Sequence, residues 1–297
     1  MKKNKPLVSI IINCFNGEQF LVDCIKSIKK QTYKNYEVIF WDNRSTDKSS
    51  AIFKETDDKR FKYYLAKKKT NLYKARNLAL SKTKGKFIGF LDVDDLWMPN
   101  KLKKQILFFK DKDIGVVYSK LWVLNEKTKK KKINYKGRLP SGYIYSKIIK
   151  NYNVGLVTTL VRKKTLLRLN KFFDLRFTHI GDFDLFIRLA KICKFKATQL
   201  PTAIYRVHSK MLTIVDKRTA IAELELWLSE NKKQINKYDF SQLYGSFLLR
   251  KFIFFKMNSR YPECLKMILK SVNVKIIVKK ILILLIPVFF LKKLIWY

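Results

Sequence analysis

Apolar and polar positions alternate along the first 113 residues in a way that predicts strands separated by helices. Apolar runs rich in β-branched and aromatic residues predict four strands. These runs are Leu7–Ile12, Tyr36–Trp41, Phe61–Leu65 and Lys86–Leu91. Strands that alternate with helical stretches are typical of βαβ units, so we expect a mostly parallel sheet covered by helices on both faces.

Three helical patterns lie between these strands. After Asn16-Gly17, the apolar spacing predicts one helix face made of Phe20, Leu21, Cys24, Ile25 and Ile28. The segment Ser45–Phe53 predicts a helix with Asp47 in its first turn, where a carboxylate is favourable. The segment Asn71–Lys82 predicts a helix that buries Leu72, Ala75, Leu78 and Ala79.

The pattern changes after about residue 113. We expect one long strand over Ile114–Leu124, a basic hairpin-type turn over Lys127–Lys132, a helix near Lys163–Asn170, an amphipathic helix over Asp182–Lys194, β-structure within Phe195–Arg206 and helices from about Lys217 onward. The sequence therefore predicts a domain over residues 1–215, made of halves 1–113 and 114–215, followed by a helical, basic region over 216–297.

Carboxylates follow the predicted strands at places where open parallel sheets bind ligands. Asp42 directly follows the second strand, Asp92-Val93-Asp94-Asp95 follows the fourth, and Asp182 opens a later helix with Asp184. Three acids within four residues repel one another unless a cation or hydrogen bonds neutralise them, and oxygen ligands favour Mg²⁺ or Mn²⁺. A solvated acidic turn, with Asp95 capping a helix near Leu96, is the alternative.

The charge is strongly unbalanced, with 64 Lys and Arg against 23 Asp and Glu, a formal net charge of +41. This balance points to a polyanionic partner, such as nucleic acid, anionic lipid or a phosphorylated substrate. Solvated lysines without a partner are the alternative. The four cysteines form no C-x-x-C pair, so we expect buried free thiols in a reducing compartment.

The two ends of the chain differ. The basic start and the run Leu7–Ile12 lack a small-residue cleavage site, so we do not expect a signal peptide. Near the other end, Ile281–Leu291 is apolar and lies between lysine pairs. As a helix it would rise about 16 Å, against a hydrocarbon core of about 30 Å. We expect this segment to lie in the interface of an anionic leaflet, and packing on the protein's own core is the alternative.

Several blocks, in this order, resemble the family 2 glycosyltransferases. They are Leu7-Val8-Ser9-Ile10-Ile11-Ile12 with Phe15-Asn16, Asp42–Asp47, Ala75-Arg76-Asn77, Gly85–Pro99, Gly181–Arg188 and Tyr205-Arg206-Val207-His208. The resemblance covers roughly residues 6–210. It implies a GT-A fold, an α/β architecture with a mostly parallel sheet flanked by helices, in which residues 1–113 bind the nucleotide and residues 114–215 contribute the acceptor and catalytic side.

The resemblance also implies roles for individual residues. Asp42 would hold the base or ribose of a nucleotide donor, Phe15 would lie beside the nucleobase where the family usually has Tyr, and Arg76 would lie near the nucleotide or its phosphates. Asp92 and Asp94 match the D-x-D pair, with Asp94 as metal ligand and Asp92 nearer the ribose, and His208 would approach the metal or diphosphate. Asp182 would be the catalytic base.

The chain departs from the family pattern at three further positions. Gly181 stands where Glu is common, and Asn43-Arg44 stands where Asp-Gly is common.

The resemblance implies an inverting glycosyltransferase that is dependent on Mn²⁺ or Mg²⁺. It would move a sugar from a nucleotide diphosphate, a UDP-sugar in the first instance, to a hydroxyl of a glycan or lipid-linked acceptor in bacterial cell-surface polysaccharide synthesis. The protein would work in the cytoplasm, peripherally at the inner face of the plasma membrane. Two alternatives remain: a non-catalytic protein that binds polyanions or nucleic acid, for which no nucleic-acid-binding motif is evident, and a nucleotidyltransferase.

Overall fold

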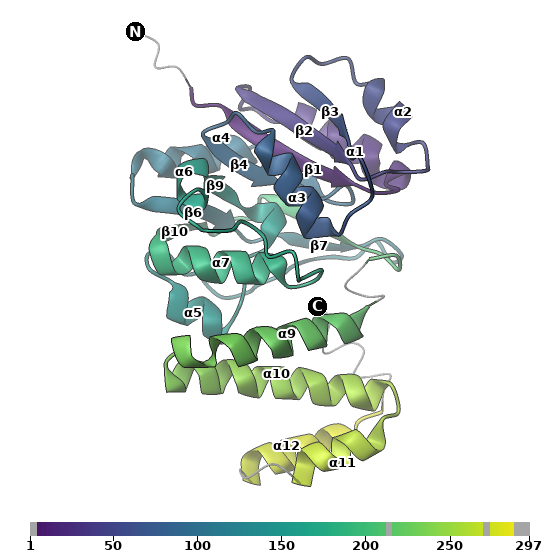
Figure 1. The fold of residues 1–297 in the computed structure, drawn as a ribbon, viewed down its shortest axis with the longest axis vertical. Helices are drawn as coiled ribbons and strands as arrows, with labels where there is room; N and C mark the ends of the chain where they lie inside the picture. The colour runs from purple at the N-terminus through teal and green to yellow at the C-terminus, as the bar shows by residue number, and fades with distance from the viewer. Residues whose placement is uncertain (1–4, 212–215, 270–273, 288–297) are drawn as a thin grey trace. The chain divides into compact units, whose positions relative to one another are not determined.

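The computed structural model describes residues 5–211, 216–269 and 274–287 (Figure 1). It divides into two compact units, one made of residues 1–148 and 152–212 and the other of 149–151 and 213–297. The first unit is mixed α/β, and the described part of the second is helical.

A seven-stranded sheet forms the centre of the first unit, with the order β10-β6-β9-β4-β1-β2-β3. Strands β1 to β4 are mutually parallel, and β9 is antiparallel to both of its neighbours. The expected mostly parallel sheet is therefore confirmed. The strands are β1 (Val8–Cys14), β2 (Tyr36–Asp42), β3 (Phe61–Leu65), β4 (Phe87–Phe90), β6 (Ile114–Ser119), β9 (Leu160–Arg162) and β10 (Lys194–Thr198).

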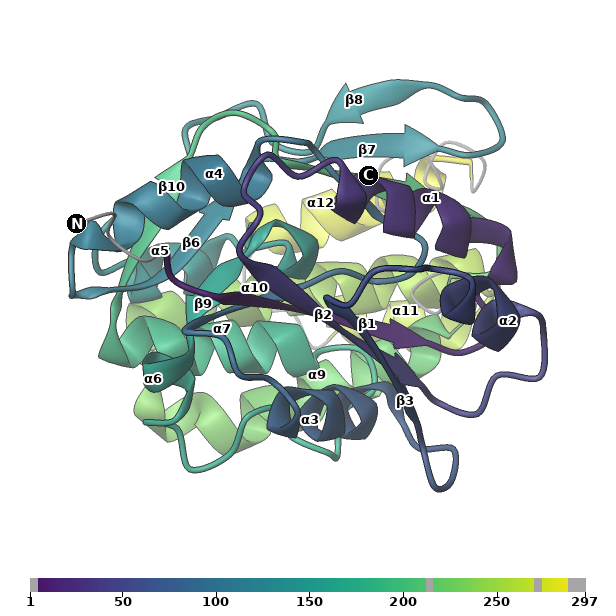
Figure 2. The same cartoon turned by 90° about the horizontal axis from the view of Figure 1, so that it is seen from above.

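Helices cover both faces of this sheet (Figure 2). One face packs against α1 (Glu18–Lys29), α2 (Ser49–Lys54) and α4 (Lys101–Ile106), which is followed by a 3-10 turn, Leu107–Lys110. The other face carries α3 (Leu72–Ser81), α6 (Lys163–Leu166) and α7 (Gly181–Ile192). A further helix, α5 (Tyr145–Lys150), and a 3-10 turn, Leu156–Thr158, precede β9. The four cysteines are buried free thiols, as expected.

The expected long strand over Ile114–Leu124 is wrong, because the chain changes sheets inside it. Strand β6 ends at Ser119, and β7 (Trp122–Asn125) belongs to a second, four-stranded sheet of order β5-β11-β7-β8. The break is held by the carbonyl of Lys120, which accepts hydrogen bonds from the hydroxyl of Ser119 and the backbone N–H of Thr202. The other strands of this sheet are β5 (Leu96–Trp97), β8 (Lys131–Ile133) and β11 (Ala203–Val207).

Other helix predictions are corrected in detail. Helix α2 begins at Ser49, because Asp47 lies outside it and accepts from the backbone N–H groups of Glu18 and Ser49. Helix α6 ends at Leu166, four residues before the expected end.

Helix α3 buries Ala75 and Ala79, as expected, but the rest of its buried face differs from the expected one. Leu78 is 37% exposed, whereas Tyr73 and Arg76 are buried. The apolar spacing missed these two residues because one is a tyrosine and the other carries a charge.

The described part of the second unit consists of α9 (Lys217–Asn231), a 3-10 turn (Lys232–Gln234), α10 (Lys237–Met257), α11 (Tyr261–Leu269) and α12 (Val274–Leu285). Phe252, Ile253, Cys264 and Ile283 form a buried cluster among α10, α11 and α12. Part of the apolar segment Ile281–Leu291 thus packs on the protein's own core, while residues 288–291 lie outside the described residues. Among the described helices, none combines the length and apolarity needed to cross a membrane.

A buried hydrogen-bond network joins the starts of β1, β2 and β4. The hydroxyl of Ser9 donates to Glu37 at 2.6 Å and accepts from the backbone N–H of Gly85 at 2.8 Å. A Cβ at Gly85 would lie 2.5 Å from the backbone N of Ser9. Only glycine therefore allows the chain to enter β4 against β1 at this distance.

We predict that Gly85→Ala lowers the free energy of unfolding by about 1–3 kcal/mol, because the added methyl group meets backbone atoms that cannot move aside. Gly245→Ala is the matched control, since a Cβ there would meet no described atom within 4 Å in the middle of α10. Ala in a helix should add up to about 1 kcal/mol. Denaturant unfolding followed by circular dichroism measures both, and equal effects at the two glycines would contradict the packing argument.

Candidate active site

The turn after β4 carries the acids Asp92, Asp94 and Asp95, and it is tied to β11. The backbone N–H of Asp95 donates to the carbonyl of Asp92 at 3.0 Å, and its buried carboxylate accepts from the backbone N–H of Arg206 at 3.0 Å. The side chain of Arg206 also donates to the carbonyl of Asp94. Burial, together with the charges of Asp94 and Asp92, raises the pKa of Asp95 well above its usual range. Asp95 thus joins the turn to β11 and caps no helix, since β5 follows it.

This connection brings together Asp94 and His208, two side chains separated by more than a hundred residues. Nε2 of His208 lies 3.0 Å from Oδ2 of Asp94, and the two side chains are 14% and 26% exposed. The His208 ring also packs against Phe20, at 4.6 Å between centroids. An imidazole nitrogen and a carboxylate oxygen are ligand atoms that suit Mn²⁺, and both side chains are partly exposed.

Within the described residues, no group of three or more His, Cys, Asp or Glu side chains is arranged to hold a metal ion. Two protein donors still fit an ion of the Mg²⁺ or Mn²⁺ type, because such ions commonly keep waters and take substrate phosphates as further ligands. The pair Asp94–His208 therefore fits a metal shared with a phosphorylated ligand.

The buried guanidinium of Arg76, on α3, pairs with the first acid of the turn. Its Nη2 lies 2.6 Å from Oδ1 of Asp92. The guanidinium carbon is 5.3 Å from the centre of the Tyr73 ring and 5.8 Å from that of Phe173, so aromatic faces surround the cation. The charges of Arg76 and Asp92 also act on Asp182. Asp92, Arg76 and Asp182, from three separate elements, thus form one charged group.

Asp182 lies in the first turn of α7 and contacts the hydroxyl of Tyr73. The backbone N–H of Asp182 donates to that hydroxyl at 3.2 Å, and one carboxylate oxygen lies 3.4 Å from it. Burial raises the pKa of Asp182 above its usual value, while the charge of Arg76 and the N–H of Phe183 act in the opposite direction. A carboxylate with a raised pKa is a stronger base than an ordinary aspartate.

Asp42 and Phe15 lie at the same edge of the sheet, at the ends of β2 and β1. The buried carboxylate of Asp42 accepts from the backbone N–H of Ser45 at 2.7 Å and from the Tyr63 hydroxyl at 2.6 Å. The Phe15 ring is 42% exposed, and the ammonium group of Lys69 lies 3.7 Å from its centre. An exposed ring at this edge can stack on a flat, electron-rich ligand.

Sequence patterns missed several residues that the structure places in this region. Tyr73 and Arg206 hold the acids in place. The side-chain N–H groups of Asn13 and Trp41, which are neighbours in the β1–β2 register, are buried and have no hydrogen-bond partner among the described atoms. Two buried donors without an acceptor suit an oxygen-rich ligand. The one signal available in the sequence was Asn13, a polar amide at the end of an apolar strand.

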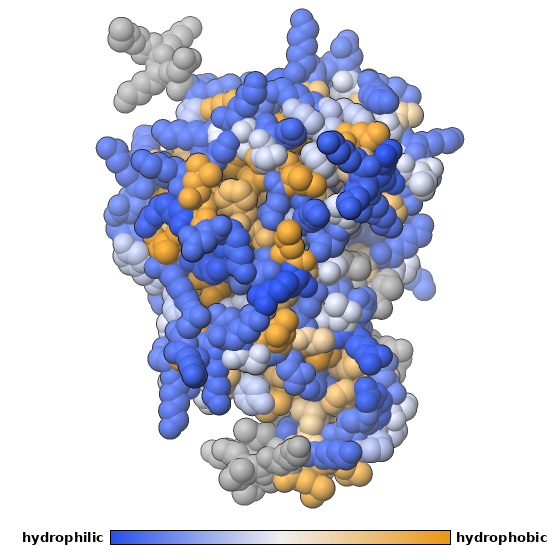
Figure 3. All heavy atoms as spheres, in the orientation of Figure 1, coloured by the Kyte–Doolittle hydropathy of each residue, from blue (hydrophilic) through white to orange (hydrophobic). Residues whose placement is uncertain are grey.

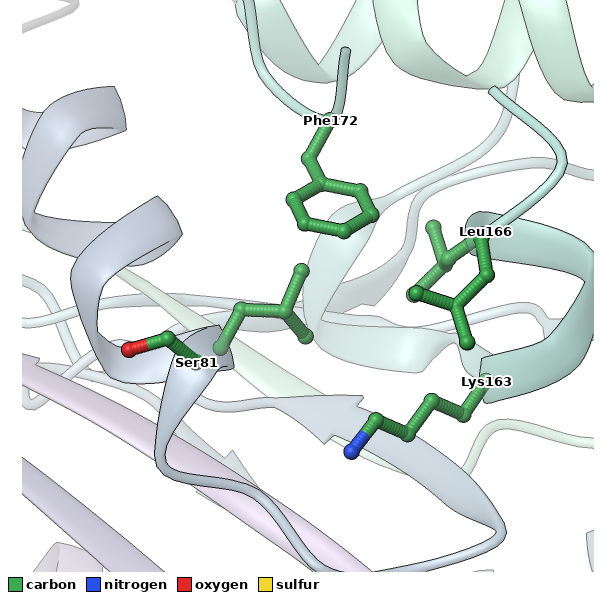
Figure 4. Close-up of a pocket in the computed structure, with 6 residues that line it drawn as sticks. Ser81, Lys163, Leu166 and Phe172 are labelled. Atoms are coloured by element: carbon green, nitrogen blue, oxygen red, sulfur yellow. The ribbon is translucent and has the colours of Figure 1, made fainter. Parts of the chain in front are cut away.

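A pocket of about 260 Å³ lies away from these acids (Figure 4). The end of α3, α6 and Phe172 line it, mostly with apolar atoms. The ammonium group of Lys163 donates to the carbonyl of Thr83 at 2.6 Å. None of the candidate residues lines this pocket, so it takes no part in the site described above.

Comparison with known proteins supports an assignment to a family. The model of "Glycosyl transferase family 2" matches residues 9–176. A curated relative from Escherichia coli, the UDP-Glc:alpha-D-GlcNAc-diphosphoundecaprenol beta-1,3-glucosyltransferase WfgD, is 34% identical over 185 residues, which cover 62% of this chain and 70% of the relative.

Two solved structures resemble the fold. TarS 1–349 from S. aureus, in complex with UDP-GlcNAc, has a TM-score of 0.64 at 19% identity, covering 92% of this chain and 79% of that one. The mannosyltransferase PcManGT from Pyrobaculum calidifontis, in complex with GDP-Man and Mn²⁺, has a TM-score of 0.51 at 17% identity, covering 74% of this chain and 60% of that one. This chain spans 50% of the longer TarS structure.

The family model covers more than half of the chain and includes the turn that follows β4. The sheet, its flanking helices and the acids at the carboxyl ends of its strands agree with this match. The chain belongs to glycosyltransferase family 2.

Proposed function

We propose that this chain transfers a hexosyl or N-acetylhexosaminyl group, with inversion, from a UDP-sugar to a hydroxyl of a lipid-linked or glycan acceptor in bacterial surface-polysaccharide synthesis. The grouping of Asp92, Arg76 and Asp182 carries the proposal, because it joins a donor-side acid to a candidate base at one edge of the sheet. The name of WfgD supports a UDP-sugar donor and a diphospholipid-linked acceptor. The UDP-GlcNAc complex of TarS supports the same donor class.

Asp182 is the proposed base. Its carboxylate takes the proton of the acceptor hydroxyl while the hydroxyl oxygen attacks the anomeric carbon from the side opposite to the diphosphate, which inverts the configuration. The raised pKa of the partly buried carboxyl suits this task. Asp42 holds the base or ribose, and Phe15 lies against the nucleobase. Arg76 is a donor-side residue that acts through its ion pair with Asp92.

Asp94 and His208 are the proposed metal-holding residues, with Asp92 toward the ribose. Bound there, Mn²⁺ or Mg²⁺ would stabilise the negative charge that develops on the leaving diphosphate. The Mn²⁺ complex of the structurally similar mannosyltransferase supports this assignment.

The first prediction from the proposed function concerns the base. Asp182→Asn should lower kcat by about 10²–10⁴-fold, since the amide cannot accept the proton, while the dissociation constant for UDP stays unchanged. UDP release from UDP-glucose and UDP-GlcNAc, with GlcNAc-diphosphoundecaprenol as acceptor, measures turnover. Asp113→Asn, at a surface ion pair with Lys194, is the control. Normal turnover by Asp182→Asn would show that another group is the base.

The second prediction follows from the raised pKa of Asp182. The carboxylate is active when deprotonated, so kcat/KM should fall as the pH is lowered through a pKa above the usual aspartate value of about 3.9. The pH profile of UDP release measures this limb. A rate that stays constant down to the ordinary aspartate range would contradict the assignment.

The third prediction concerns the metal. UDP with Mn²⁺ should raise the melting temperature of the wild type, because ligands that bind only the folded state stabilise it. Asp94→Asn and His208→Asn should remove the part of this shift that depends on Mn²⁺, and Asp113→Asn should retain it. Differential scanning fluorimetry with and without Mn²⁺ measures the effect. A full shift in both site variants would place the metal elsewhere.

We also propose that the second unit binds an anionic membrane surface, where a lipid-linked acceptor is found. Several large apolar side chains on α11 and α12 are exposed: Leu265 (55%), Leu269 (84%), Leu282 (56%) and Leu285 (75%). Figure 3 shows hydrophobic spheres on the surface of the unit that contains these helices. The net charge of +41 favours anionic head groups.

The fourth prediction tests this surface. Replacing Leu265, Leu269, Leu282 and Leu285 together by Ser should weaken binding to phosphatidylglycerol vesicles more than about tenfold, since each leucine loses a favourable transfer from water. The control replaces Leu107 and Leu200 of the first unit, which are 57% and 62% exposed. Co-sedimentation with phosphatidylglycerol and phosphatidylcholine vesicles measures binding, and equal binding by the fourfold variant would remove this surface from consideration.

A further inference from the structure

The start of α7 is packed directly against the ring of Tyr73. A Cβ at Gly181 would lie 2.5 Å from Cε2 and 2.6 Å from Cδ2 of that ring, closer than real Cβ contacts. The ring is 2% exposed and stacks on Phe173 at 5.1 Å between centroids, so a shift of the ring would disturb this packing. The absence of a side chain at Gly181 is therefore what allows the first turn of α7 to contact Tyr73.

The hydroxyl of Tyr73 uses this close contact to bond with the segment that presents Asp182. It accepts from the backbone N–H of Asp182 at 3.2 Å, and its proton faces the carbonyl of His179 at 3.1 Å and a carboxylate oxygen of Asp182 at 3.4 Å. A single hydroxyl thus contacts the chain before α7, the first turn of the helix and the carboxylate itself.

Tyr73 also connects Asp182 to the rest of the charged group. It lies one helical turn before Arg76 on α3, and the guanidinium of Arg76 is near its ring. The same helix therefore fixes the cation that pairs with Asp92 and the hydroxyl that contacts Asp182.

We propose that Tyr73 is the positioning residue for the Asp182 carboxylate, and that Gly181 and Tyr73 form a matched pair in which the tyrosine ring occupies the volume a side chain at 181 would need. This inference rests on the proposed role of Asp182 as base. It also gives a physical reason for the glycine at 181, since Tyr73 of α3 both occupies the space beside it and contacts Asp182.

Tyr73→Phe tests the hydroxyl, because it retains the ring and removes only the oxygen. We expect kcat for UDP release to fall by about 10- to 100-fold, as for a small misplacement of a catalytic group. The KM for the UDP-sugar and the dissociation constant of UDP should stay within about twofold, because the variant leaves the donor-side residues in place. Tyr118→Phe is the matched control, since this buried hydroxyl donates to the carbonyl of Pro140 at 2.7 Å, away from Asp182. Its kcat should equal that of the wild type.

A double-mutant cycle tests the packing and needs no substrate. Gly181→Ala should lower the melting temperature in the wild-type background, because the new methyl group meets the ring. In the Tyr73→Ala background the same change should have little effect, because the ring is gone. An equal loss in both backgrounds would overturn the matched pair.

The outcomes separate this inference from the function on which it rests. If Asp182→Asn is inactive and Tyr73→Phe turns over as fast as Tyr118→Phe, the positioning role is wrong and the base assignment stands. If Asp182→Asn is fully active, the base assignment itself fails. A fall in kcat for Tyr73→Phe that is matched by an equal rise in the dissociation constant of UDP would also overturn the positioning role, since it would place the effect on the donor side.

Discussion

The buried cation of Arg76 is the interaction on which the candidate site depends. Asp92 and Asp182 both lie within reach of its charge, and burial by itself disfavours the ionised form of Asp182. Without the guanidinium, the charge of Asp92 and the desolvation of Asp182 would act together to favour the protonated form of Asp182. A buried ion pair is not a dependable source of stability, because desolvation offsets the attraction. We therefore interpret the role of Arg76 as keeping Asp92 and Asp182 ionised and close to one another.

Two further sets of hydrogen bonds position the acids. The Asp95–Arg206 contacts tie the acidic turn to β11 and so bring His208 to Asp94, while Tyr73 contacts the first turn of α7. In both cases a regular element, and not a loop alone, fixes the functional side chain. Sites supported in this way hold their geometry better than sites formed by loops only.

The strands of the first half could be predicted from the sequence because each is a short apolar run bounded by polar residues. The site acids could be located as well, since carboxylates that directly follow such runs must lie at one edge of a parallel sheet. Both predictions use only residues that are neighbours along the chain. The structure confirms the predicted strands β1 to β4. The roles of the acids themselves stay predictions that the experiments above test.

The sequence failed where distant contacts decide the outcome. Inside Ile114–Leu124, only the polar pair Ser119-Lys120 marks the place where the chain changes sheets. The change itself depends on a distant residue, Thr202, which precedes β11 and donates to the carbonyl of Lys120. Part of the buried face of α3 was missed for a similar reason. Tyr73 is buried because it stacks on Phe173, and Arg76 is buried because it pairs with Asp92. A periodicity rule counts neither Tyr73 nor Arg76 as apolar.

The departures from the family pattern have local explanations of the same kind. Arg44 adopts a φ of 69°, a conformation that suits the glycine common at this position and costs other residues of the order of 1 kcal/mol. Its guanidinium donates to the carbonyl of Lys67 at 2.8 Å, and the neighbouring Asn43 amide donates to the carbonyl of Thr70 at 2.7 Å. These bonds offset the strain by fixing the loop between β3 and α3. This loop leads into α3, which carries Tyr73 and Arg76. Arg44 therefore helps to fix the helix whose side chains contact Asp182 and Asp92.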